Sequence, residues 1–175
     1  MPTNNKVFST DNVLTGRTQI ETSFGANSDD FTIDSNNVLN LKNKTSYWSC
    51  PGNNFHPTSP DTTDHSYDSN GNMSWNDTGE AHAPVFLPEG AVVTAVAVYG
   101  NADAAASAAW SLKRKDVDAE SINSTMASAA VNTADSSISN ATIDNTTYSY
   151  HFAVEGLDVG DKIYGARITY TTDYD

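Results

Sequence analysis

Hydrophobic and polar residues alternate in four stretches of the second half of the chain. The clearest stretch is residues 91–100, AVVTAVAVYG, where one set of alternate positions is branched and bulky and the other is mostly small. The same two-residue period is present in residues 108–115, 148–154 and 162–171. Successive side chains of a strand point to opposite faces of a sheet. The alternation therefore predicts four strands.

Three local features modify this pattern. Gly165 lies inside the last predicted strand, where a glycine indicates a bulge or a close approach of another backbone. Residues 156–162, GLDVGDK, predict a turn. Two alanine-rich segments, residues 102–109 and 127–134, have helical propensity but lack an apolar stripe of 3.6-residue period, so propensity and periodicity disagree there.

Hydrophobic residues are sparse before Trp48. The segment 31–43, FTIDSNNVLNLKN, has too few of them to form a core by itself. Short strands with apolar residues need a partner surface, and a symmetric oligomer supplies one from identical chains. The residues predicted to oligomerise or anchor the chain are Phe24, Phe31, Ile33, Val38, Leu39 and Leu41.

Together these patterns predict an all-β protein of two parts. Residues 1–45 are expected to be an extended anchoring or trimerising segment, and residues 46–175 an antiparallel, jelly-roll-like β-sandwich. A length of 175 residues fits one domain with an appendage.

Charge narrows the classes of partner. Twenty-two acidic and nine basic residues give a formal net charge of −13, which repels phosphate backbones and argues against nucleic-acid binding. The basic cluster at residues 113–115 is followed by Asp116 and is predicted to be a solvated strand end. No apolar run approaches the roughly 18 residues of a membrane span, so no membrane partner is expected.

Cysteine content and the first residues bear on the cellular compartment. Cys50 is the single cysteine, which excludes an intrachain disulfide and a multi-cysteine zinc site and predicts a buried or half-buried thiol. Residues 1–12 lack the apolar region of a secretory signal, so we expect a protein that is made and stays in the cytoplasm.

Residues 68–80, DSNGNMSWNDTGE, begin like a calcium-binding loop. Oxygen-bearing residues occupy the first, third and fifth positions, but the sixth is a methionine and the glutamate comes one place late. A turn held by Asx side chains is the favoured interpretation, and calcium is the alternative. The candidate calcium ligands are Asp68, Asn70, Asn72 and Glu80.

Catalytic motifs are not evident in the sequence. It has no G-x-S-x-G elbow and no glycine-rich phosphate loop, and its four histidines are not at metal-ligand spacing. His82 and His151 are expected to be able to approach each other in a folded sheet, with surface histidines as the default interpretation. We therefore predict no enzyme activity, no metal and no cofactor.

Aromatic residues suggest a second kind of site. Trp75 lies inside a polar turn and, with Tyr67, is predicted to contact a glycan through the apolar ring face. Trp110 occupies a strand position and is predicted to belong to the core.

Several motifs resemble a β-sandwich family found in phage-associated and uncharacterised bacterial sequences. The first is residues 82–101, HAPVFLPEGAVVTAVAVYGN, in which a proline-rich entry leads into a long strand. Further motifs are residues 111–114, 126–127, 142–145, 148–150 and 163–170. The resemblance covers about residues 46–171 and implies a sandwich fold, with no catalytic motif to carry over.

The segment 31–43 separately resembles the β-rich stalks of trimeric phage fibres, in which apolar residues face symmetry mates. With the features above it predicts a non-enzymatic virion structural protein, namely a homotrimeric fibre, spike or capsid-decorating (cement) protein. Its partners would be copies of itself and other virion proteins, and its location the virion. The alternative is a carbohydrate- or receptor-binding module that contacts a host surface glycan.

Overall fold

The computed structural model describes residues 31–33, 39–41, 43–58, 65–120 and 123–172, and the chain divides into two units, residues 1–42 and 43–175. In the first unit, β1 (Phe31–Ile33) and β2 (Leu39–Leu41) pair antiparallel, with Phe31 opposite Leu41 and Ile33 opposite Leu39. These are four of the six predicted anchoring residues. Phe24 and Val38 lie outside the described residues.

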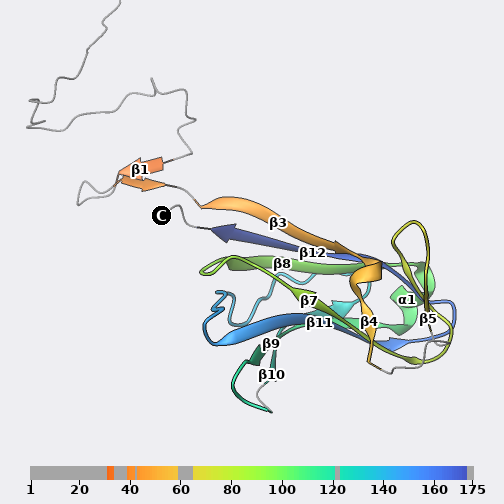
Figure 1. The fold of residues 1–175 in the computed structure, drawn as a ribbon. Coiled ribbons are helices and arrows are strands. Elements are labelled where there is room, and N and C mark those ends of the chain that lie inside the picture. The colour runs from red at the N-terminus through yellow and green to blue at the C-terminus, as the bar shows by residue number, and fades with distance from the viewer. Residues whose placement is uncertain (1–30, 34–38, 42, 59–64, 121–122, 173–175) are drawn as a thin grey trace, which may run out of the picture. The chain divides into compact units, whose positions relative to one another are not determined.

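The second unit is a sandwich of two antiparallel sheets (Figure 1). The first sheet has the strand order β10-β9-β11-β7-β4, and the second has the order β3-β12-β6-β5, with β8 also paired to β12. The elements are β3 (Lys44–Pro51), η1 (Gly52–Asn54), β4 (His56–Pro57), β5 (His65–Tyr67), β6 (Met73–Trp75), β7 (Gly79–Val85), β8 (Val92–Gly100), α1 (Ala102–Ser107), β9 (Ala109–Asp116), β10 (Asn123–Ala130), β11 (Tyr148–Leu157) and β12 (Lys162–Thr172).

The all-β sandwich predicted from the sequence is confirmed, and so are its four long strands. They are β8, β9, β11 and β12, whose bounds differ from the predicted ones by at most three residues. The jelly-roll connectivity stays a prediction. No helix among the described residues is long and apolar enough to cross a membrane.

The core lies between the two sheets, where the inward-facing half of each alternating strand is buried. Phe152 of β11 is at its centre and is fully buried. Its ring centroid is 6.2 Å from that of Phe55, 6.3 Å from that of Trp110 and 6.1 Å from that of Trp48. Trp110 is 1% exposed, which confirms its predicted place in the core.

The two alanine-rich segments have different structures. Residues 102–107 form α1, whose first turn is capped by the Asn101 side chain accepting from the Ala104 N–H at 3.1 Å. Residues 127–130 belong to β10, which pairs with β9. A side-chain cap favours the helix in one case, and the backbone partners offered by β9 favour the strand in the other.

Gly165 and Cys50 show how closely β3 and β12 approach. A Cβ atom at Gly165 would lie 2.4 Å from the Cys50 carbonyl oxygen, which confirms the predicted close approach. Cys50 is buried, as predicted. Its burial raises the pKa of the thiol to about 11, against the smaller opposing effect of a hydrogen bond with the Ala166 backbone.

Candidate functional site

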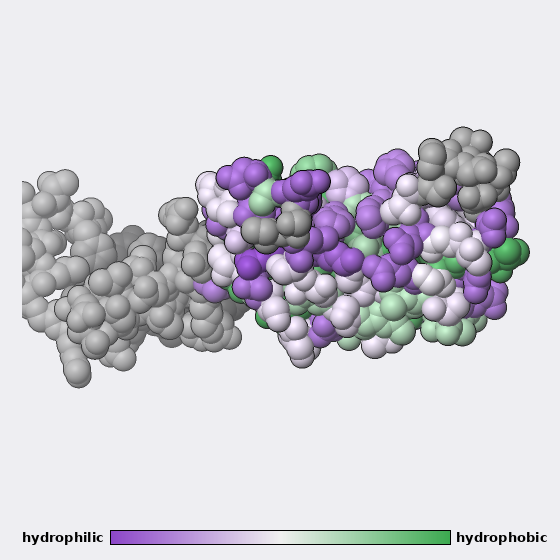
Figure 2. Space-filling view, turned by 90° about the horizontal axis from the view of Figure 1, so that it is seen from below, coloured by the Kyte–Doolittle hydropathy of each residue, from purple (hydrophilic) through white to green (hydrophobic). Residues whose placement is uncertain are grey.

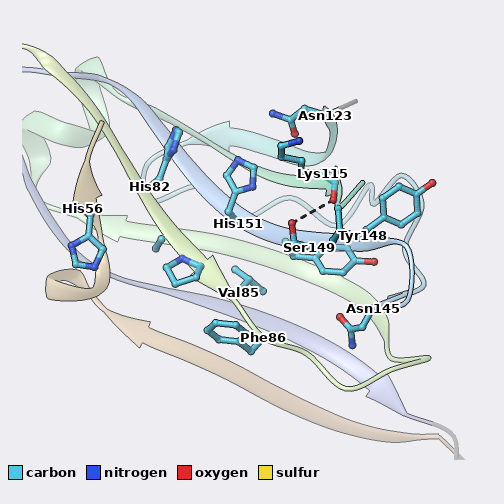
Figure 3. Close-up of a pocket in the computed structure, with 14 residues that line it drawn as sticks. His56, His82, Val85, Phe86, Lys115, Asn123, Asn145, Tyr148, Ser149 and His151 are labelled. Carbon is cyan, nitrogen blue, oxygen red and sulfur yellow. Dashed lines mark hydrogen bonds between the residues drawn. The ribbon is translucent and has the colours of Figure 1, made fainter. Parts of the chain in front are cut away.

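A groove of about 840 Å³ lies on the outer face of the first sheet, near the end of β7 and the start of β11 (Figure 3). The alternation that fills the core also builds this groove. In β7, Ala81, Ala83 and Val85 are buried, while His82 and Pro84 between them are exposed. The groove is lined by His56, His82, Ala83, Pro84, Val85, Phe86, Lys115, Val117, Asn123, Asn145, Tyr148, Ser149, Tyr150 and His151.

Three histidines come from three neighbouring strands of this sheet. His56 of β4 is the register partner of His82 of β7. The ring centroids of His82 and His151 lie 5.4 Å apart, which confirms the predicted approach of these two residues. Burial lowers the pKa of His151, and the neighbouring positive charges of His82, Lys113 and Lys115 lower it further. The His151 ring is therefore neutral at pH 7.

An ordered turn forms one end of the groove. The Asp144 carboxylate accepts from the Thr146 hydroxyl at 2.6 Å and from the backbone N–H groups of Thr146 at 3.0 Å and Thr147 at 3.1 Å, and these bonds hold its pKa below the usual range. The Asn145 amide donates to the Leu87 carbonyl at 3.0 Å. These bonds hold Asn145 in place at the groove.

Lys115 marks the opposite edge. Its ammonium donates to the backbone carbonyls of Ala119 at 2.6 Å and Glu120 at 3.3 Å, so it holds the connection that follows β9. The Ser149 hydroxyl donates to the Lys115 carbonyl at 3.4 Å, drawn as a dashed line in Figure 3. The prediction of a solvated strand end is thus too simple for Lys115, because this residue lines the groove.

The electrostatic character of the groove differs from that of the whole chain. None of its fourteen lining residues is an aspartate or a glutamate, whereas the chain has 22 acidic and nine basic residues. Phe86, the residue directly after β7, adds an apolar ring that is 76% exposed. The groove therefore combines an aromatic face with amides, a hydroxyl, imidazoles and one ammonium group.

The predicted glycan contacts lie elsewhere. Trp75 is 3% exposed, and a Cβ atom at Gly79 would lie 2.7 Å from its ring, so the prediction of an accessible stacking surface is wrong for Trp75. The polar residues around it in sequence concealed the alternation of β6, which turns both Met73 and Trp75 inward. Tyr67 is 43% exposed, and its hydroxyl donates to the Phe55 carbonyl at 2.8 Å.

The candidate calcium loop is closed by its own hydrogen bonds. Asp68 accepts from the backbone N–H groups of Asn70 at 2.8 Å and Asn72 at 3.1 Å, and from the Asn72 side chain at 2.9 Å. This is the Asx turn that the sequence favoured. Glu80 lies on β7, and the described part of the chain contains no group of three or more His, Cys, Asp or Glu residues arranged to hold a metal ion.

Sequence reasoning missed most of the groove. It singled out the approach of His82 and His151 but not the contributions of His56, Phe86 or Asn145. One signal was present: the exposed positions of AHAPV, residues 81–85, are a histidine and a proline between small or apolar residues. The sequence does not show which strands become neighbours, so it could not bring the remaining residues together.

Comparison with known proteins adds a single weak likeness. No family model and no curated protein matches the chain. Among solved structures, a xylan-binding module CBM15 is similar, with 17% sequence identity and a TM-score of 0.41. The match covers 73% of this chain and 97% of that one.

Proposed function

We propose that the second unit is a non-catalytic carbohydrate-binding module that holds a saccharide in the groove of the first sheet. The observation that carries the proposal is the pairing of an exposed aromatic ring, Phe86, with uncharged hydrogen-bonding side chains such as Asn123 and Ser149 in one open groove. Sugar rings present apolar C–H faces together with hydroxyl groups that both donate and accept. An aromatic face and nearby amide, hydroxyl and imidazole groups suit both features.

The dimensions and chemistry of the groove support a binding role. Its volume of about 840 Å³ is within the roughly 300–1,000 Å³ range of small-molecule sites. Glycoside hydrolysis uses two carboxyl groups on either side of the scissile bond, whereas the lining residues offer imidazoles, amides and hydroxyls. This chemistry favours holding a sugar over cleaving it.

Matched aromatic variants test the proposal. Calorimetric titration with a panel of plant, algal and bacterial oligosaccharides would identify a ligand for the full chain. We expect Phe86→Ala to weaken its binding about tenfold or more, because the exposed ring is the apolar stacking surface of the groove.

Tyr47→Ala is the control, because Tyr47 is 67% exposed on β3 in the second sheet. Loss of binding in Tyr47→Ala with retention in Phe86→Ala would move the site to the second sheet. Failure of every saccharide in the panel to bind would overturn the proposal.

A second candidate function is assembly into a virion through the first unit. It is favoured by the β1–β2 hairpin, in which four of the predicted anchoring residues are direct register partners. In this proposal residues 1–45 form a homotrimer with copies of the chain and dock on other virion proteins, as in a fibre, spike or cement protein. The groove would then contact a host surface glycan.

Solution mass tests this second candidate. Light scattering should give a trimer for the full chain and a smaller species for the double variant Leu39→Asp, Leu41→Asp, because two carboxylates would oppose burial of this hairpin between chains. A monomeric full chain, or a variant that stays trimeric, would contradict it.

A further inference from the structure

The distribution of charge points to the class of saccharide that the groove takes. The chain has a formal net charge of −13, yet the groove lining has no acidic side chain, one lysine and three histidines. Lys113, two residues before Lys115 on the same strand, adds a positive charge beside it and is paired with Glu155 at 3.0 Å.

We infer that the groove binds an anionic saccharide, whose carboxylate or sulfate group is held at the pair of imidazoles formed by His82 and His151. This inference rests on the proposed carbohydrate-binding function and adds the charge of the ligand to it. Two kinds of saccharide carry a suitable oxyanion on the sugar ring, namely a uronic acid and a sulfate ester.

The geometry of the two imidazoles carries the inference. His82 and His151 come from adjacent strands, and their ring planes are inclined by 52° at a centroid separation of 5.4 Å. In the close-up both lie on the groove side of the sheet (Figure 3). No hydrogen bond joins either ring to another residue in the described part of the chain, so their N–H groups are available to a ligand. An oxyanion between the rings can accept from both.

The groups around His151 define how protonation and binding are coupled. β7 contributes His82, β9 contributes Lys113 and Lys115, and Glu155 of β11 is paired with Lys113 at 3.0 Å. Without a ligand, a proton on His151 is opposed by burial and by these positive charges. An anion between the rings offsets that repulsion, so binding and protonation favour each other.

Arg114 alternates with Lys113 and Lys115 along β9 and is not among the residues that line the groove. The Arg114 guanidinium lies 4.3 Å from the centroid of the Tyr148 ring, and its Nε donates to the Ser124 hydroxyl at 3.0 Å. The stacked guanidinium helps to hold the Tyr148 ring, which does line the groove, in place.

Titration of the full chain with matched ligands tests the inference. The probes are a galacturonic acid oligosaccharide, the same oligosaccharide with methyl-esterified carboxyl groups, and a sulfated galactan oligosaccharide. At about pH 5.5, we expect at least one anionic probe to bind roughly tenfold more tightly than the ester. We also expect this preference to shrink at about pH 7.5, where the lowered pKa of His151 leaves its imidazole neutral. Comparison of the two anionic probes distinguishes uronate from sulfate.

Histidine variants locate the anion. His82→Gln and His151→Gln each keep a polar side chain but remove one imidazole of the pair, and each should abolish most of the difference between the two pH values. Arg167→Gln is the matched control, because it removes one positive charge from the outer face of the second sheet and should leave that difference intact. His82 is the more exposed of the pair, so His82→Gln provides the test if His151→Gln disturbs folding.

The outcomes separate the two proposals. Binding of the methyl ester or another neutral saccharide as tightly as the anionic probes would overturn the anionic ligand and leave the carbohydrate-binding function in place. Binding of anionic probes that is unaffected in both histidine variants would overturn the assigned position. Absence of binding by every neutral and anionic saccharide would overturn the proposed function itself.

Discussion

The outer faces of the two sheets have different chemistry although the same alternation produces both. On the first sheet, outward positions carry His82, His151 and Lys115 and form a groove. On the second sheet, Tyr47 of β3 lies opposite Thr169 of β12, and the neighbouring Arg167 is stacked 5.7 Å from the Tyr99 ring centroid.

This difference predicts which of the two outer faces would bind a ligand in a pH-dependent way. Imidazoles change charge between about pH 5 and 8, whereas tyrosine and arginine do not. The surface on the side of β9 and β10 is mostly hydrophilic, with small apolar patches (Figure 2). Binding at the first sheet should therefore depend on pH near neutrality, and binding at the second sheet should not.

The largest loss of stability is expected from a substitution in the core that supports both faces. Phe152→Ala should lower the free energy of unfolding by about 3–5 kcal/mol, because a fully buried ring in contact with three other aromatic rings is lost. Urea denaturation followed by tryptophan fluorescence measures the change. Phe86→Ala, at an exposed position, should stay within about 0.5 kcal/mol of the wild type; equal losses in the two variants would contradict this picture of the core.

A smaller effect should be specific to the second sheet. Gly165→Ala places a Cβ atom against the Cys50 carbonyl oxygen, so β3 and β12 must move apart at a cost of about 1–3 kcal/mol. Gly160→Ala is the control, since open space surrounds it and only its positive φ of 93° opposes the side chain, at about 1 kcal/mol. If the denaturant midpoint falls equally in both variants, the close approach of β3 and β12 is not the cause of the stability lost in Gly165→Ala.

The stability of the folded chain should also depend on alkaline pH, because Cys50 is buried in the second sheet. The folded chain raises the pKa of this thiol from 9.0 to about 11, so the native state holds the proton more tightly than the unfolded state. The resulting stability is fully present below pH 9 and is lost as pH rises toward 11. Denaturation at several pH values should show a steeper alkaline decline for the wild type than for Cys50→Ala. Parallel curves would exclude the thiol as the cause.

The smallest effects belong to the exposed Asx turns. Hydrogen bonds lower the pKa of Asp144 and of Asp68, so their contributions are present above pH 3.8 and are lost as pH falls through the lowered values. Asn substitutions at either site should reduce this acid sensitivity in denaturation experiments. Asp144→Asn should also weaken saccharide binding slightly, because Asn145 lines the groove, whereas Asp68→Asn should not; equal effects on binding would contradict a groove confined to the first sheet.

Calcium gives one further check on the Asp68 turn. Its carboxylate oxygens already accept three hydrogen bonds from Asn70 and Asn72. We expect millimolar calcium to leave the thermal midpoint unchanged, because an ion would have to displace these bonds. A calcium-dependent rise that is lost in Asp68→Asn would support the alternative that the sequence left open.

The sequence by itself determined the features that depend on neighbouring residues. Alternation over about eight to ten residues identified β8, β9, β11 and β12, since each strand must present one apolar face to a core whatever its partners are. Local chemistry likewise identified the Asx turn at Asp68. The oligomeric and virion roles of residues 1–45 stay predictions.

Only the tertiary structure decided which surfaces meet and which are covered. Trp75 has polar neighbours in sequence yet is buried, and residues 127–130 form a strand against β9 despite their helical propensity. The groove joins side chains from five strands, from His56 to His151. Strand pairing over such separations depends on hydrogen-bond partners distant in sequence and on the packing of two sheets, and these interactions leave no periodic signal in the local pattern of residues.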